Sequence, residues 1–124
     1  MNKKQILIVD DDVELQKLMT KGLEYQGYQC TCTSFAETAL ESLKKLKPNL
    51  VILDLGLRHA DGTAFLKHAC EWINKGEQVP PILILSGRKE KEVIDHCLEN
   101  GASGFLTKPV DYKILLSMVN SYIR

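Results

Sequence analysis

The feature that most constrains the fold is an alternation of strand-like and helix-like segments, repeated five times along the 124-residue chain. The strand-like segments are residues 6–9, 28–33, 50–53, 82–85 and 103–107. Three of them are unbroken apolar runs, which are typical of strands buried on both faces of a parallel sheet. Five β-α units in one domain predict a doubly wound α/β fold, with a parallel sheet, helices on both faces and right-handed crossovers.

After each predicted strand, apolar residues recur three or four positions apart, as on one face of an amphipathic helix. The five predicted faces are Leu15, Leu18, Met19, Gly22 and Leu23; Ala36, Ala39, Leu40 and Leu43; Leu66, Ala69, Cys70 and Ile73; Val93, Ile94, Cys97 and Leu98; and Leu115, Met118, Val119 and Tyr122. Gly27 is placed to end the first helix, and Asn100-Gly101 to end the fourth. A length of 124 residues suits a single domain over residues 1–124.

Composition excludes several classes of protein. Lys and Arg together number 16, as do Asp and Glu, so no net charge draws the chain to nucleic acid or to a membrane. The apolar runs are far shorter than the roughly 20 residues that span a bilayer. The apolar stretch near the N-terminus breaks into three aspartates, where a signal peptide would lead to a cleavage site. We therefore expect a cytoplasmic protein.

The cysteines and histidines do not indicate a separate reactive site. The four cysteines form no CxxC pair, and we expect reduced thiols, with Cys30 and Cys32 on one face of a strand. The histidines at positions 59, 68 and 96 are interpreted as solvated or packing residues. Trp72 is expected to be a partly buried packing residue.

Polar residues follow the predicted strands at their carboxyl ends, where open α/β sheets bind ligands. They are Asp10, Asp11 and Asp12 after the first strand, Asp54 after the third, Ser86 after the fourth, and Thr107 and Lys108 after the fifth. Because parallel strands end at one edge of a sheet, these groups are predicted to meet there. Carboxylates about 4–6 Å apart repel one another, and a divalent cation with hard oxygen ligands, best matched by Mg²⁺, would relieve the repulsion.

The remaining groups of this set suit phosphoryl transfer. A lysine and a hydroxyl can donate to phosphoryl oxygens, and such transfer depends mainly on positioning and on neutralising negative charge. Asp12 is a separate case, because an aspartate at this point often caps the following helix. Nothing in the set looks like a base for activating a substrate hydroxyl.

Four motifs carry a resemblance that covers essentially the whole chain. They are ILIVDDD at 6–12, LVILDL at 50–55 with Asp61-Gly62 after it, ILILSG at 82–87 and GASGFLTKP at 101–109. Each motif is weak alone, but in this order and spacing they resemble a response-regulator receiver domain of two-component signalling. The resemblance implies a chemotaxis-regulator-like, flavodoxin-like (βα)5 domain, whose five parallel strands have the order 2-1-3-4-5.

The resemblance also implies roles for individual residues. Asp54 would accept a phosphoryl group from a phosphohistidine and form an aspartyl phosphate. The Mg²⁺ ligands would be Asp10, Asp11, Asp54 and the backbone carbonyl of Gly56. Lys108 would pair with the phosphoryl oxygens, and the Lys108-Pro109 peptide is expected to be cis.

Two further residues match switch positions of the family. Ser86 would donate a hydrogen bond to the phosphoryl group once it is attached. Phe105 matches an aromatic switch position, although a core phenylalanine would explain it equally well, and it lacks the hydroxyl of the commoner tyrosine.

Some residues differ from the usual pattern of the family. Arg58 stands where proline is usual, which predicts a less rigid loop with added positive charge. Gly56 has no side chain, and Arg88 follows Ser86-Gly87. We hypothesise that Gly56 exposes the phosphoryl group to water and that Arg88 reaches over this group and tunes its hydrolysis. The alternative is that Arg88 simply points into solvent.

The expected function is therefore a phosphoacceptor switch rather than an enzyme with turnover. The expected partner is a histidine kinase or a histidine phosphotransfer protein. Phosphorylation would alter the surface of the fourth helix, fifth strand and last helix, where a target or a second copy could bind. Two alternatives remain open: a haloacid-dehalogenase-like phosphatase and a degenerate receiver that binds partners without phosphorylation.

Overall fold

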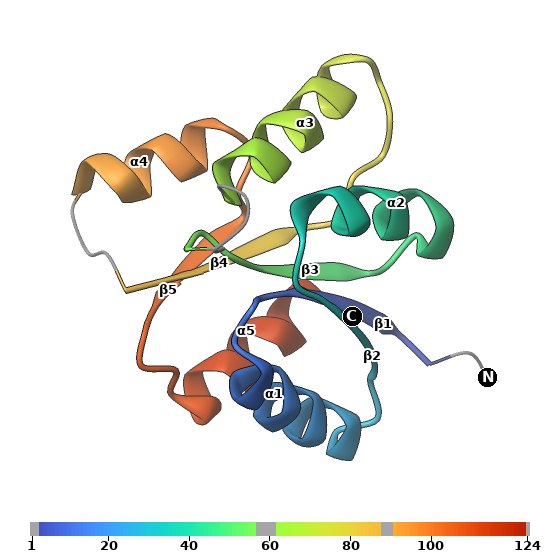
Figure 1. The fold of residues 1–124 in the computed structure, drawn as a ribbon, viewed down its shortest axis with the longest axis vertical. Helices are drawn as coiled ribbons and strands as arrows, with labels where there is room; N and C mark the ends of the chain where they lie inside the picture. Colours follow the sequence, from blue (N-terminus) through green and yellow to red (C-terminus); the bar gives the residue numbers. More distant parts are fainter. Residues whose placement is uncertain (1–2, 57–61, 88–90, 124) are drawn as a thin grey trace.

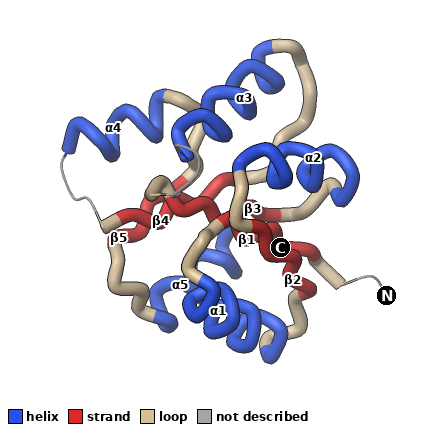
Figure 2. Tube along the Cα trace, viewed as in Figure 1, coloured by secondary structure: helices blue, strands red, loops and turns tan. Residues whose placement is uncertain are grey.

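The computed structural model describes residues 3–56, 62–87 and 91–123, which form strands and helices in strict alternation (Figures 1 and 2). The elements are β1 (Gln5–Val9), α1 (Val13–Tyr25), β2 (Gln29–Thr33), α2 (Ala36–Leu46), β3 (Leu50–Asp54), α3 (Gly62–Asn74), β4 (Ile82–Ser86), α4 (Lys91–Glu99), β5 (Gly104–Thr107) and α5 (Tyr112–Tyr122). In this part of the chain, no helix has the length and apolar character needed to cross a membrane.

The strands form one parallel sheet in the order β2-β1-β3-β4-β5, as expected. Helices α1 and α5 cover one face of the sheet, and α2, α3 and α4 cover the other (Figure 1). The register pairs Val9 with Leu53 and Ser86 with Thr107. Strands that end level with one another bring the residues that follow them to one edge.

The core has two parts, one on each face of the sheet. All residues of β3 and β4 are buried, as the unbroken apolar runs predict. One cluster joins the sheet to α2, α3 and α4, and includes Phe65 and Leu66; the other joins it to α1 and α5, and includes Met19 and Leu115. Trp72 is partly buried against the first cluster, as expected.

Two residues of the predicted apolar helix faces are exposed in the described part of the chain. Leu18 of α1 is 57% exposed and Leu98 of α4 is 45% exposed. In each case the neighbouring residue, Met19 or Cys97, occupies the buried position, and one residue along a helix turns about 100° away from it. The predicted apolar faces of α1 and α4 are therefore wider than their buried faces, because each includes one exposed leucine.

The helix ends follow the sequence signals. Asp12 caps α1, and its carboxylate accepts a hydrogen bond from the backbone N–H of Leu15 at 3.1 Å. Gly27 and Gly101 follow α1 and α4 with φ values of 97° and 102°, a left-handed conformation that costs glycine little. The capping interpretation of Asp12 and both predicted helix ends are confirmed.

Candidate functional site

Three carboxylates meet at the carboxyl edge of the sheet. Asp10 and Asp11 follow β1, and Asp54 is the last residue of β3. Ligand oxygens of these three residues lie within 4.8 Å of one another. Asp10 and Asp54 are only 1% and 5% exposed, whereas Asp12 points away to cap α1. The structure thus brings together the three side chains that the sequence predicts as metal ligands.

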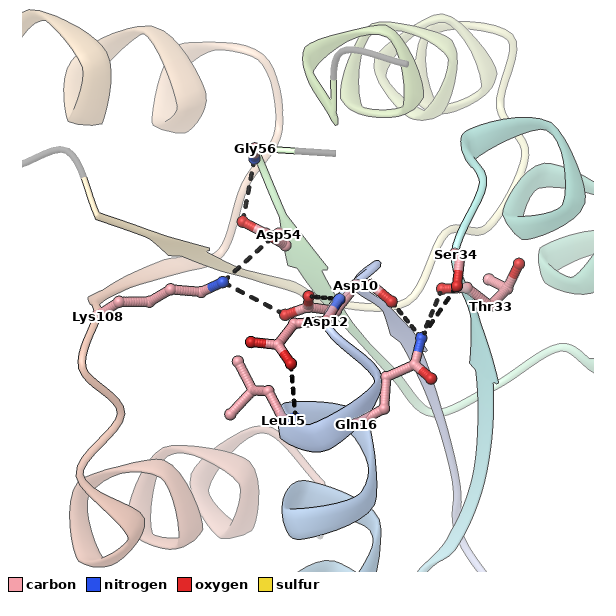
Figure 3. Close-up of polar contacts among 9 residues, drawn as sticks. All are labelled: Asp10, Asp12, Leu15, Gln16, Thr33, Ser34, Asp54, Gly56 and Lys108. Atoms are coloured by element: carbon pink, nitrogen blue, oxygen red, sulfur yellow. Dashed lines mark hydrogen bonds and ion pairs between the residues drawn. The ribbon is translucent and has the colours of Figure 1, made fainter. Parts of the chain in front are cut away.

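Lys108 lies between two of these carboxylates (Figure 3). Its ammonium nitrogen is 3.2 Å from Oδ2 of Asp54 and 3.5 Å from Oδ2 of Asp10. Its backbone N–H donates to the carbonyl of Ser86 at 2.8 Å, which ties the end of β5 to the end of β4, and the Lys108-Pro109 peptide is cis, as expected. Burial alone would lower the pKa of Lys108, but the charges of Asp10 and Asp54 raise it above its ordinary value.

Backbone N–H groups orient two of the carboxylates. The N–H of Asp12 donates to Oδ1 of Asp10 at 2.9 Å, and the N–H of Gly56 donates to Oδ1 of Asp54 at 3.0 Å. A Cβ atom at Gly56 would lie 3.6 Å from that same Oδ1. A side chain at position 56 would therefore begin in ordinary contact with the Asp54 carboxylate.

The donor set suits a divalent cation. Burial raises the pKa of Asp10, and the charge of Asp54 raises it further, while the Asp12 N–H and Lys108 lower it. A carboxylate that is costly to keep charged gains from a nearby cation. Hard oxygen donors with room for further ligands are the set that Mg²⁺ prefers. Asp10, Asp11 and Asp54 therefore fit a Mg²⁺ ion in chemistry and spacing.

A cavity of about 680 Å³ opens from the Asp54 carboxylate toward α4. Ser86, which is buried, and Lys108 line it beside Asp54, so the structure brings together the predicted acceptor, hydroxyl and amine. The α4 side chains that also line it are Glu92, Val93, His96 and Cys97. The sequence did not predict that these α4 residues line the cavity, because their spacing and charge indicated only a packed helix face and solvated surface charges.

Other predicted residues lie outside this constellation or outside the described residues. Phe105 on β5 is half-buried and packs against the core cluster beneath α2, α3 and α4, so its role as a switch stays a prediction. Arg58, Arg88 and His59 lie outside the described residues.

The remaining thiols and imidazoles fit the expected structural roles. The four cysteines, all of them among the described residues, are reduced and form no disulfide. Burial, together with the nearby Cys32 and Glu24, raises the pKa of Cys30 to about 12. His68 is exposed on α3, 3.7 Å from Glu71.

Comparison with known proteins identifies the family. The model of a family described as the response regulator receiver domain matches residues 6–120. The transcriptional regulatory protein PmrA of Pectobacterium parmentieri is 36% identical over 120 residues, covering 97% of this chain and 52% of PmrA. PhoP of Bacillus subtilis, named as an alkaline phosphatase synthesis transcriptional regulatory protein, is 33% identical over 124 residues, covering 100% of this chain and 50% of PhoP. This chain thus spans about half the length of these relatives.

Solved structures agree with these sequence matches. A CheY-like response regulator receiver domain protein from Methanospirillum hungatei superposes with a TM-score of 0.85 at 28% identity, covering 97% of this chain and 93% of that one. The BeF3-activated receiver domain of RstA from Klebsiella pneumoniae gives 0.86 at 26% identity, covering 98% and 99%. The alternative of a haloacid-dehalogenase-like phosphatase finds no support in these matches. The chain belongs to the response-regulator receiver domains of two-component signalling.

Proposed function

We propose that this receiver domain accepts a phosphoryl group on Asp54 from the phosphohistidine of a histidine kinase or a histidine phosphotransfer protein. The observation that carries the proposal is the position of the Lys108 ammonium, 3.2 Å from the carboxylate of Asp54 at the mouth of a cavity. A cation at this distance can pair with an incoming phosphoryl oxygen as well as with the acceptor.

In the proposed reaction, an Oδ atom of Asp54 attacks phosphorus and the bond from phosphorus to the donor imidazole nitrogen breaks. The electron pair of that bond stays on the imidazole. The N–H of Gly56, which already donates to Oδ1, holds the carboxylate so that Oδ2 faces Lys108. Ser86 lines the same cavity, and its hydroxyl would donate to a phosphoryl oxygen after transfer.

Asp10, Asp11, Asp54 and the carbonyl of Gly56 would hold Mg²⁺, which would neutralise charge on the phosphoryl group as it is transferred. Lys108 would supply a further positive charge to the phosphoryl oxygens. Three carboxylates and one ammonium leave an excess of negative charge at this edge, which supports a second cation in the site.

The proposed output is a change in the surface of α4, β5 and α5. A phosphoryl group adds charge and acceptor oxygens beside Ser86 and Lys108, at the ends of β4 and β5, and so favours one of two arrangements of that surface. Exposed apolar side chains on these helices, Leu98 and Ile114, suit contact with a target or a second copy. The relatives are named as transcriptional regulators. For this chain we propose only that the altered surface passes the signal on to some target.

The proposal is tested by acetyl-phosphate labelling with Mg²⁺, followed by mass spectrometry of the intact chain and its peptides. We expect one phosphoryl adduct on Asp54 when Mg²⁺ is present during labelling. We expect no adduct when EDTA is present from the start, and none in Asp54→Asn. Asp95→Asn, which changes an exposed aspartate of α4, is the matched control and should label normally. Equal labelling of Asp54→Asn and the wild type would refute the proposed acceptor, and an unlabelled wild type would favour the degenerate receiver.

A further inference from the structure

The side chain of Gln16, in the first turn of α1, reaches back to the carboxyl ends of β1 and β2 (Figure 3). Its amide nitrogen donates to the backbone carbonyl of Asp10. It also lies 3.4 Å from the carbonyl of Thr33 and 3.4 Å from the hydroxyl oxygen of Ser34, at the end of β2. Gln16 therefore joins the turn after β1 to the end of the neighbouring strand β2.

Both backbone polar groups of Asp10 are held in this way. Its N–H donates to the carbonyl of Thr33 at 3.0 Å, and its carbonyl accepts from Gln16. That carbonyl belongs to the peptide plane that connects Asp10 to Asp11. A rotation of this plane changes ψ of Asp10 and φ of Asp11, and so moves the Asp11 carboxylate relative to Asp54.

We propose that Gln16 is a positioning residue for Mg²⁺, because its amide fixes the Asp10–Asp11 peptide so that the carboxylates of Asp10 and Asp11 converge with that of Asp54. The inference rests on the proposed Mg²⁺ site. Metal ligands depend on the hydrogen bonds that orient them, and loss of such a partner typically lowers affinity about 10- to 100-fold. Gln16 is half-buried beside the turn, so water replaces its amide only in part.

A purely structural role makes a different prediction. If Gln16 only fastened α1 to the end of β2, its loss would lower the free energy of unfolding and leave the affinity of the folded protein for Mg²⁺ unchanged. Mg²⁺ affinity and metal-free stability must therefore be measured separately.

The test is calorimetric titration of the purified, unphosphorylated chain with MgCl₂, beside urea unfolding in EDTA. Gln16→Met keeps the length of the side chain and removes the donor, so we expect its Kd for Mg²⁺ to rise at least about tenfold. Gln29→Met, at an exposed position near the far end of β2, is the matched control and should bind as the wild type does.

The outcomes separate this inference from the proposed function. A Kd for Gln16→Met within twofold of the wild type overturns the positioning role, even if the variant is less stable, and leaves the labelling of Asp54 untouched. A wild type that binds no Mg²⁺ overturns both. If Gln16→Met does not fold, Gln16→Asn, which keeps the amide on a shorter chain, replaces it under the same criterion.

Discussion

Lys108→Met should show how much the ammonium group of Lys108 contributes to the stability of a fold that holds Asp10, Asp11 and Asp54 close together. At an effective dielectric constant of about 20, Coulomb's law gives about 5 kcal/mol of attraction for a charge pair at 3.2 Å or at 3.5 Å, the two distances from Lys108 to Asp54 and Asp10. The Lys108 side chain is 27% exposed, so solvent screens part of this attraction. The free energy spent in removing the ammonium group from water offsets a further part of it. Removing one partner of a buried pair typically costs about 3–5 kcal/mol, and we expect about 3 kcal/mol here.

Mg²⁺ should reduce this loss. Without metal, Lys108→Met leaves three carboxylates within 4.8 Å of one another and removes the ammonium group that pairs with two of them, so the folded state carries more of their repulsion. With Mg²⁺ bound, the ion supplies the missing positive charge. We therefore expect the difference in unfolding free energy between the wild type and Lys108→Met to shrink as MgCl₂ is added.

The assay is urea unfolding followed by circular dichroism, in EDTA and in excess MgCl₂. A loss of 3 kcal/mol corresponds to a fall in the midpoint of roughly 1–3 M urea for a domain of this size. Lys17→Met, at an exposed position of α1, is the matched control and should change the midpoint little. Equal midpoints for Lys108→Met and Lys17→Met in EDTA, or a loss that does not depend on Mg²⁺, would refute the electrostatic reasoning.

Two further predictions concern the residue at position 56 and a half-buried thiol. Gly56→Asn should lengthen the lifetime of the aspartyl phosphate about three- to tenfold, roughly 0.7–1.4 kcal/mol in barrier height, because the new side chain starts in contact with Oδ1 of Asp54 and shields the phosphoryl group from water. Gel-shift decay of phosphorylated protein measures this lifetime, and an unchanged lifetime would contradict the prediction. Iodoacetamide at pH 8 should modify exposed Cys32 well before Cys30, since a pKa of about 12 leaves only about one Cys30 thiol in 10⁴ ionised. Peptide mass spectrometry measures the two rates of modification, and equal rates would argue against the prediction.

The fold could be predicted from the sequence because its strands are buried on both faces. Residues 50–53 and 82–85 are unbroken apolar runs, and such runs fit the interior of a sheet that has helices on both sides and fit an antiparallel sandwich poorly. The helices were predicted less accurately in detail. Leu18 and Leu98 recur at helical spacing but lie outside the narrow buried stripe of each helix, and sequence spacing alone does not give the rotation of a helix about its axis.

The same distinction separates the site residues that the sequence indicates from those that it does not. Asp10, Asp54 and Lys108 directly follow or end strands, and parallel strands that end level bring such residues together whatever the helices do. Gln16 and His96 reach the site from helices, so their positions depend on how α1 and α4 pack against the sheet. Charge and residue type marked the first group in the sequence, whereas a glutamine on a helix resembles any solvated residue. The proposed dependence of Mg²⁺ affinity on Gln16 is therefore the claim for which the three-dimensional structure was needed, and the titration of Gln16→Met tests it directly.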